Sequence, residues 1–348
     1  MNSTRKWLTL SLMISIAAII FVLSFTVTEE TIDSLSKIRP EYLLLAVFLR
    51  TLCWVAMGLR IKILSRVVGN KISLMETLKI VLPGTFAAGV TPSYVGGEPV
   101  RIYLLSKKGI SIGDAAAVDL GGMILDGLVV GIMLPFAWFI FRDVMRPNLV
   151  LSSVFLFVGI LLVFAWGFGV YGIVKPKRLK QLLESLGKSK LAGKITFGRS
   201  EQIAGRIVLE IDNFRNGLIR FIREGQKELL LGLLLSVAYW LLLITLPSII
   251  LMGMNLDPVW WQSMAAQVIL MTIVMIPIAP GGSGIAEIGA ASLYSVILSS
   301  DGLQVLGVFV LIWRFVEHYI PLLIGGVVSL KVMREIDLDA LTRQHENV

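Results

Sequence analysis

Six long apolar runs limit what this chain can fold into, and they cover residues 7–27, 42–63, 112–141, 149–173, 229–253 and 303–333. A membrane-crossing helix needs about 20 consecutive, mostly apolar residues to match the thickness of the hydrocarbon layer. Only 16% of the 348 residues are charged, whereas a soluble domain has about 25%. The sequence therefore predicts an all-α, polytopic membrane helix bundle with about six full spans.

Two further apolar stretches, near 77–105 and 259–299, are interrupted by glycine and proline. The first contains the run PGTFAAGVTPSYVGGEPVR at 83–101, and the second contains PIAPGGSGIAE at 277–287. Proline cannot continue a helix, and glycine adopts backbone conformations that other residues avoid. Unwound backbone at membrane depth is stable only where protein buries it or where it lines a wet cavity. Each stretch therefore predicts a re-entrant hairpin, and the alternative is two kinked full spans in each.

The distribution of Lys and Arg over the loops predicts how the spans are oriented. Segment 174–228 holds thirteen basic residues and loop 60–79 holds five, whereas loops 254–258 and 299–302 hold none. Cytoplasmic loops are enriched in Lys and Arg. We therefore expect a multi-pass plasma-membrane protein with both termini and both basic loops in the cytoplasm. This orientation requires each broken stretch to leave the membrane on the side from which it entered.

The charge argument divides a single predicted domain, 1–348, into two inverted repeats and flanking segments. In chain order these are a first span at 7–27, repeat one at 42–141, a span at 149–173, a basic cytoplasmic segment at 174–228, repeat two at 229–333 and a cytoplasmic tail at 334–348. Broken helices at matching positions of two repeats are typical of a transporter's binding site. We therefore expect the two hairpins to meet near the membrane midplane and to enclose a polar cavity.

The segment 174–228 contains a predicted amphipathic, basic helix. Its apolar side chains recur at helical spacing from Ile203 to Phe221, and arginines accompany them. Two interpretations stay open. The helix can lie on an anionic inner leaflet, or it can form a cytoplasmic hairpin that buries its own apolar face.

Ionisable residues inside the predicted spans extend the candidate site beyond the two hairpins. A charge near the bilayer centre costs about 2.5–3.5 kcal/mol, so such residues usually face a partner or water. Asp119 and Asp126 are seven residues apart and share a helix face, and His318 is interpreted as a polar side chain that a neighbour satisfies. The structural alternatives are an ion pair between Arg314 and Glu317, or pairing of Asp126 or Glu317 with Arg50 or Arg314. The predicted substrate-binding residues are Arg50, Thr91, Pro92, Gly96, Gly97, Glu98, Arg101, Asp126, Pro280, Gly281, Gly282, Gly284, Glu287, Arg314 and Glu317.

The sequence offers no pattern of catalytic or metal-binding residues. Its cysteine and histidine content is Cys53, His318 and His345, which leaves no Cys/His ligand set. The glycine-rich runs lack the Gly-Lys-Ser/Thr that completes a phosphate-binding loop. We therefore predict no catalytic residue, no metal and no cofactor, and we favour a non-enzymatic role. The net charge of +8 is attributed to cytoplasmic loops rather than to nucleic-acid binding.

Three groups of residues occur in a specific order. They are Thr91-Pro92 with Gly96-Gly97-Glu98-Pro99 and Arg101, then Pro280-Gly281-Gly282-Ser283-Gly284 with Glu287, then Arg314 with Tyr319 and Pro321. In this order and spacing the chain resembles the lysylphosphatidylglycerol synthase transmembrane (flippase-like) family, which includes UPF0104-type membrane proteins. The resemblance covers nearly the whole chain. It implies a membrane domain that moves a lipid between leaflets.

In that family the membrane domain is often fused to a cytoplasmic domain that transfers lysine from charged tRNA to phosphatidylglycerol. Here about fifteen residues follow the last predicted span, and 174–228 is too short for such a domain. Lysyl transfer by this chain is therefore not expected.

Three functions follow as hypotheses. The first is a flippase or transporter for a phospholipid or lipid-linked carrier, with anionic or zwitterionic headgroups as ligands. The second is a membrane component of aminoacyl-phosphatidylglycerol-type lipid biosynthesis, acting as or with a transferase. The third is a non-catalytic subunit that recruits a soluble lipid-modifying partner through 174–228. A homo-oligomer also stays open, and nucleic acid is not an expected partner.

Overall fold

The computed structural model describes residues 37–92, 94–145, 153, 156, 159–160, 200–274 and 279–346. Every regular element within these ranges is a helix, so the predicted all-α class is confirmed. The predicted span 7–27, the segment 174–199 and most of the predicted span 149–173 lie outside the described residues.

Among the described residues, four helices are long and apolar enough to cross a membrane. They are α3 (Pro40–Val67), α6 (Ile112–Met145), α11 (Gln226–Gly253) and a composite of α15 (Leu306–Arg314), η1 (Phe315–Tyr319) and α16 (Ile320–Glu346). Each corresponds to a predicted span, although the ends differ by several residues. In the composite span, η1 is a π-helical turn inserted between two α-helical parts.

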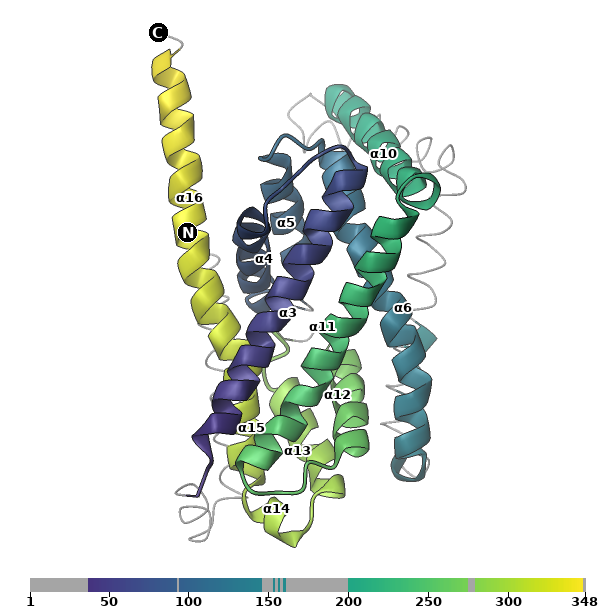
Figure 1. Cartoon of the computed structure of the whole chain (residues 1–348), viewed down its shortest axis with the longest axis vertical. Helices are drawn as coiled ribbons and strands as arrows, with labels where there is room; N and C mark the ends of the chain where they lie inside the picture. The colour runs from purple at the N-terminus through teal and green to yellow at the C-terminus, as the bar shows by residue number, and fades with distance from the viewer. Residues whose placement is uncertain are drawn as a thin grey trace.

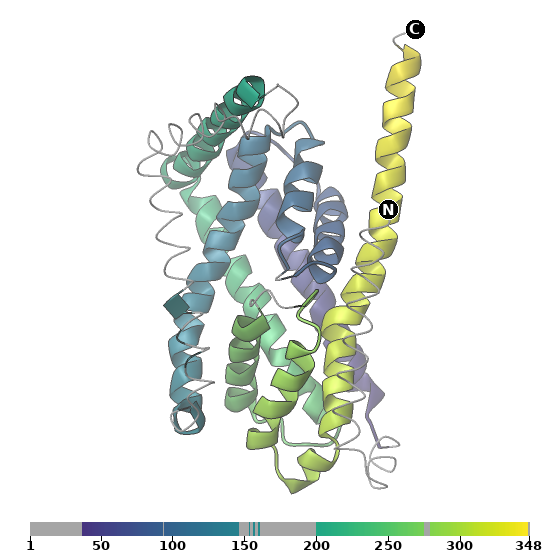
Figure 2. The ribbon, with the colours of Figure 1, turned by 180° about the vertical axis from the view of Figure 1, so that it is seen from behind.

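Each broken stretch forms two shorter helices that fold back on each other. The first hairpin consists of α4 (Leu74–Gly89) and α5 (Gly97–Ser106), and the second consists of α12 (Trp260–Val274) and α13 (Ile285–Ile297). Figures 1 and 2 show α4 and α5 in the upper half of the bundle, and α12 and α13 in the lower half. The hairpins therefore enter from opposite ends of the bundle and stop near its middle. A short helix, α14 (Ser300–Gln304), leads from α13 to α15.

The two halves of the bundle are inverted relative to each other. The first helix of each half, α3 or α11, runs antiparallel to its counterpart, because the amide of Arg39 before α3 donates to the carbonyl of Gly253 at the end of α11 (2.8 Å). Farther along the same pair, the Cys53 thiol lies 3.9 Å from the Tyr239 carbonyl oxygen. In each half a long helix, a broken hairpin and a second long helix follow in the same order. The loop charges predicted inverted repeats, and the helices follow each other in the order that this prediction requires.

Two apolar cores fill the bundle, one around each hairpin. Along α11, Leu229 packs against the upper core, whereas Leu243 belongs to the lower core. Ser236 lies between them and is fully buried. Along the last span, Glu317 and His318 fall between Val316 of the lower core and Ile320, which packs against the upper core. Polar side chains therefore collect where the two cores meet.

Helix α3 continues past the predicted loop boundary at residue 60 and ends at Val67. Arg60, which was predicted to lie in a basic loop, is therefore a buried helical residue. Composition alone could not place this end, because Lys and Arg in the last two turns of a helix look like the start of a basic loop.

Helix α10 (Ser200–Arg223) packs against the first turns of α6. Its Leu218 and Phe221 are buried in the upper core, and Arg220 forms an ion pair with Asp114 of α6. This differs from both interpretations of the amphipathic segment, because this part of the apolar face is covered by the bundle itself. The side chains of residues 200–211 lie outside the described part of the chain.

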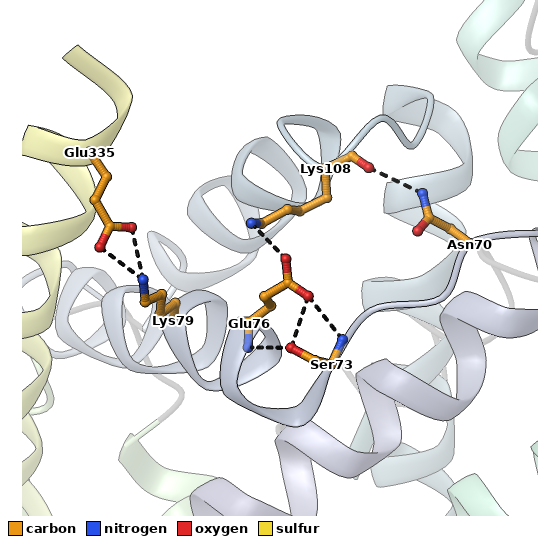
Figure 3. Close-up of polar contacts among 6 residues, drawn as sticks. All are labelled: Asn70, Ser73, Glu76, Lys79, Lys108 and Glu335. Carbon is orange, nitrogen blue, oxygen red and sulfur yellow. Dashed lines mark hydrogen bonds and ion pairs between the residues drawn. The ribbon is translucent and has the colours of Figure 1, made fainter. Parts of the chain in front are cut away.

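The first hairpin begins and ends at a polar junction on the surface (Figure 3). The Ser73 hydroxyl accepts from the Glu76 amide, and the Glu76 carboxylate accepts from the Ser73 amide, so the start of α4 has a reciprocal cap. Lys108, just after α5, donates to Glu76 at 3.0 Å. The Ser73 amide and the Lys108 ammonium lower the pKa of Glu76 to about 2. Both ends of the hairpin are thus joined through one carboxylate.

Candidate functional site

The tips of the two hairpins touch at the centre of the bundle. Pro92 and Pro280 form an isolated antiparallel bridge, and the Gly281 amide donates to the Thr91 carbonyl at 3.1 Å. The Tyr94 hydroxyl donates to the Gly281 carbonyl at 2.9 Å. Tyr94 has a positive φ of 59°, a strained backbone state for a residue with a large side chain. The predicted meeting of the hairpins is therefore present, and it depends on a few backbone contacts.

Gly281 is at the centre of this contact. Its φ is +56°, and a Cβ there would lie 2.4 Å from the Gly89 carbonyl oxygen and 2.4 Å from His318 Cε1. A side chain at this position would have to displace both the backbone of the first hairpin and the last span. Glycine is thus required for the tips to approach.

The second hairpin is fixed to the last span by a buried ion pair. Arg314 Nε donates to Glu287 Oε1 at 2.8 Å, and the side chains are only 2% and 0% exposed. A second guanidinium nitrogen of Arg314 donates to the Gly281 carbonyl at 2.8 Å. The other Glu287 oxygen accepts from the Gly284 amide at 2.7 Å, at the start of α13. Arg314 therefore contacts the tip as well as the returning helix.

The first hairpin is fixed to α6 by a buried ion pair in which the hairpin carries the cation and α6 carries the carboxylate. Arg101 of α5 donates to Asp119 of α6 at 2.6 Å, and both side chains are buried. Arg101 also contacts Glu98 at 3.1 Å. A Cβ at Gly84 would lie 2.5 Å from Arg101 Cγ, so the absence of a side chain on α4 makes room for this arginine.

The two ion pairs occupy equivalent places in the inverted repeats. In repeat one the cation is on the returning hairpin helix and the carboxylate is on the following span. In repeat two the carboxylate is on the hairpin, and the cation is on the span. Each returning helix is therefore held to its own repeat by one buried charge of each sign.

A third buried ion pair joins α3 to α6. Arg60 pairs with Asp126 and also donates to the Ser236 hydroxyl of α11 at 2.6 Å. The predicted site residue Asp126 is thus paired with Arg60, which was not one of its predicted partners. Neither the proposed pairing with Arg50 nor that with Arg314 is present.

The π-helical turn η1 carries the remaining charged residues near the hairpin tips. π-Helical turns are rare and are frequent at functional sites. Glu317 accepts from the Gln267 amide nitrogen of α12 at 2.9 Å. Arg314 interacts electrostatically with Glu317, but its direct contact is with Glu287, so the proposed Arg314–Glu317 pair is not the contact that forms.

Arg50 and His318 complete this region. Arg50 is 7% exposed, and its Nε and Nη1 have no hydrogen-bond partner among the described residues. The His318 ring lies against Gly281 and Gly89, and its Nε2 likewise has no partner in the described part of the chain. The prediction that a neighbour satisfies His318 is therefore not met at Nε2.

Most of the predicted site residues lie at or beside the hairpin tips, where some form the contact and others support the loops. Thr91, Pro92, Pro280 and Gly281 form the contact itself. The Gly96 amide donates to the Thr91 hydroxyl at 2.8 Å, so this glycine supports the loop before α5. Gly97 packs beside the Arg101 guanidinium. Gly282 and Gly284 both adopt positive φ in the loop before α13.

Arg60, Gln267 and Tyr94 make contacts at this site but were not among the predicted site residues. Arg60 was hidden by its position near a basic loop, and Gln267 is one polar residue in an apolar helix. Tyr94 lies between two residues of the first motif, and its position inside a broken hairpin was the available signal.

The described residues contain no group of three or more His, Cys, Asp or Glu side chains that could hold a metal ion. The carboxylates within hydrogen-bonding distance of arginines at the tips are occupied by those arginines.

Comparison with known proteins gives consistent matches over almost the whole chain. Residues 8–325 match the family described as the lysylphosphatidylglycerol synthase TM region. A UPF0104 membrane protein of Archaeoglobus fulgidus is 29% identical over 320 residues, which cover 91% of this chain and 94% of that protein. UPF0104 membrane proteins of Methanocaldococcus jannaschii and Pyrococcus horikoshii are 25% and 22% identical, over 94% and 92% of this chain and 96% of each relative. This chain therefore belongs to the lysylphosphatidylglycerol synthase transmembrane-region family.

Proposed function

We propose that this protein moves a phospholipid or a lipid-linked carrier between the two leaflets of the plasma membrane. The observation that supports this function best is the contact between two broken hairpins, which enter from opposite ends of an inverted-repeat bundle. Inverted repeats with discontinuous helices at the centre are the architecture of many alternating-access transporters. The lysines and arginines at the α10 end favour placing that end in the cytoplasm.

The arrangement of ion pairs supports movement of one repeat against the other. Arg60–Asp126 and Arg101–Asp119 lie within repeat one, and Glu287–Arg314 lies within repeat two. Each repeat can therefore move as a body without separating these buried charges. Such a separation would cost several kcal/mol, because an unpaired charge would remain buried.

The contact between the repeats at the tips is much weaker. It includes the Gly281–Thr91 and Tyr94–Gly281 hydrogen bonds. Two hydrogen bonds contribute about 1–3 kcal/mol together. The loss of these two hydrogen bonds alone is small enough for the tips to separate in a minor conformer. In this proposal, separation of the tips opens a polar path for the headgroup, first toward one end of the bundle and then toward the other.

Reconstitution tests this function directly. Purified protein in liposomes should accelerate the exchange of a fluorescently labelled phospholipid between leaflets, measured by chemical quenching of the outer leaflet. Protein-free liposomes supply the background, and Lys79→Ala is a matched control because the Lys79–Glu335 pair is exposed and takes no part in the contact between the tips (Figure 3). Exchange no faster than in protein-free liposomes, for phospholipids and a polyprenyl phosphate alike, would reject the proposal.

A further inference from the structure

One buried arginine differs from the others in what it contacts. Arg60, Arg101 and Arg314 each form a direct ion pair with a carboxylate. Arg50 of α3 forms none with any described residue, although it is almost completely buried. Its guanidinium lies 5.3 Å from the centre of the Trp54 ring, and the indole N–H of Trp54 also has no acceptor among the described residues. Donors are therefore gathered here without the acceptors that would satisfy them.

Unsatisfied buried donors need a physical explanation, because each one costs free energy relative to its hydrated state. Arg50 Nε and Nη1 together with the Trp54 N–H are three buried donors without acceptors among the described residues, and an acceptor-rich group would satisfy them. A phosphate has several acceptor oxygens and a negative charge, and arginine binds it with two parallel hydrogen bonds. The donor set on α3 thus has the chemistry of a phosphate site.

A carboxylate of complementary character lies close by. Helix α3, which carries Arg50, packs against the π-helical turn that carries Glu317, but the two Arg50 nitrogens named above make no bond to this carboxylate. Glu317 accepts from Gln267 Nε2 at 2.9 Å. The Gln267 side-chain oxygen is buried and has no donor within the described part of the chain. Glu317 and Gln267 are therefore two acceptors side by side, and they suit a group with several N–H donors.

The other charged residues that the sequence predicted are engaged elsewhere. Glu287 is paired with Arg314, Asp126 with Arg60, and Glu98 with Arg101. We infer that Arg50 and Glu317 together bind the headgroup of a zwitterionic phospholipid, with its phosphate at Arg50 and its primary ammonium at Glu317 and Gln267. This inference rests on the proposed function, because it names the class of lipid that the bundle would carry.

The charge pattern explains why a zwitterion fits better than either simpler headgroup. A purely anionic headgroup would bring a phosphate to Arg50 but no cation to balance the Glu317 carboxylate, and a purely cationic group would leave Arg50 without an anion. A quaternary ammonium has no N–H to donate, so it would leave the Glu317 and Gln267 oxygens without hydrogen bonds. A phosphate followed by a primary ammonium satisfies both sets of groups at once.

Binding of short-chain lipids to the purified full chain tests this assignment. Dihexanoyl phosphatidylethanolamine, phosphatidylglycerol and phosphatidylcholine share their acyl chains and differ in the headgroup, and native mass spectrometry can measure each dissociation constant. We expect phosphatidylethanolamine to bind at least about tenfold more tightly than the other two, the equivalent of one charge-assisted hydrogen bond. Equal binding of phosphatidylglycerol and phosphatidylethanolamine would overturn the inference.

Two substitutions separate the two halves of the headgroup site. Arg50→Gln should weaken all three lipids by about tenfold or more, and Arg50→Lys should restore part of that loss. Glu317→Gln should weaken phosphatidylethanolamine and strengthen phosphatidylglycerol, because the repulsion of the anion is removed. A purely structural role of Glu317 would weaken both lipids together, and that result would contradict the inference.

Folding is monitored in each variant through Cys53, which is 0% exposed and is the single cysteine of the chain. Where Arg50→Gln exposes this thiol without heating, Arg50→Lys and Glu317→Gln decide the question. Failure of the inference is also distinguishable from failure of the proposed function. Lipid exchange without headgroup preference rejects the site alone, whereas selective binding without lipid exchange rejects transport alone.

Discussion

Replacing Arg314 with methionine should destabilise the bundle strongly, because Glu287 would be left as a fully buried carboxylate without its cation. The structure shows two contacts that would be lost, the 2.8 Å pair with Glu287 and the 2.8 Å bond to the Gly281 carbonyl. Removing one partner of a buried ion pair costs about 3–5 kcal/mol. The Gly281 carbonyl keeps the Tyr94 hydroxyl as a donor, so the second loss adds only about 1 kcal/mol.

The double variant Arg314→Met/Glu287→Gln should recover most of this cost. It leaves no buried charge, and the glutamine oxygen can still accept from the Gly284 amide that Glu287 now caps. Replacement of a whole buried pair by neutral groups is often close to neutral. We therefore expect the double variant to lie within about 1–2 kcal/mol of the native protein, and the coupling between the two sites to exceed about 2 kcal/mol.

The buried Cys53 thiol provides the assay. A thiol-reactive fluorophore labels Cys53 only when the packing between α3 and α11 opens, so its signal during denaturant titration in detergent reports unfolding. Lys79→Met is the matched control, because the Lys79–Glu335 pair is exposed and should contribute about 0–1 kcal/mol. If Arg314→Met unfolds at the same denaturant concentration as Lys79→Met, the reasoning about the buried pair is refuted.

Three further predictions concern the tips and the surface junction. Gly281→Ala should destabilise the protein more than Gly69→Ala in the Cys53 assay, because both residues have positive φ but only Gly281 has backbone 2.4 Å from a new Cβ; equal losses would show that the tips adjust freely. Tyr94→Phe should cost about 0.5–1.5 kcal/mol and increase hydrogen exchange of the Gly281 amide, since one of the contacts that join the tips is lost; unchanged exchange would contradict this. The folded-state pKa of Glu76 is lowered from 4.5 to about 2, so its stabilisation is present above pH 4.5 and lost as the pH falls toward 2. Glu76→Gln should remove that part of the pH dependence of hydrogen exchange at the start of α4, and an unchanged slope would contradict the assignment.

The clustered glycines and prolines around Thr91–Pro99 and Pro280–Gly284 were sufficient to predict the two breaks, whereas the isolated Pro83, Pro135 and Pro247 lie inside helices. The runs around Thr91-Pro92 and Pro280-Gly281 also located the point of contact. Loop charges predicted an inverted order of the repeats, and the antiparallel packing of α3 and α11 agrees with that order. These signals are local, and a sequence displays them directly.

The partners in the buried ion pairs could not be predicted from the sequence in the same way. Local spacing favoured Arg314–Glu317, because residues three apart share a face of an α-helix. The chain forms a π-helical turn from Phe315 to Tyr319, which changes the angle between successive side chains, and Arg314 instead reaches Glu287 on α13. Asp126 likewise pairs with Arg60, which is 66 residues away. Such pairs depend on how helices pack, and a single sequence does not record that.

A disulfide between the hairpin tips tests the central claim that the tips must separate for lipid to move. Pro92 and Pro280 lie opposite each other in an antiparallel bridge, where Cα atoms are about 4.5–5.5 Å apart, within the range that a disulfide spans. In a Cys53→Ala background, Pro92→Cys/Pro280→Cys should form this bond on oxidation and stop lipid exchange in liposomes. Exchange should return on reduction, and the two single-cysteine variants should not respond to the oxidant. Undiminished lipid exchange by the fully cross-linked protein would contradict the account.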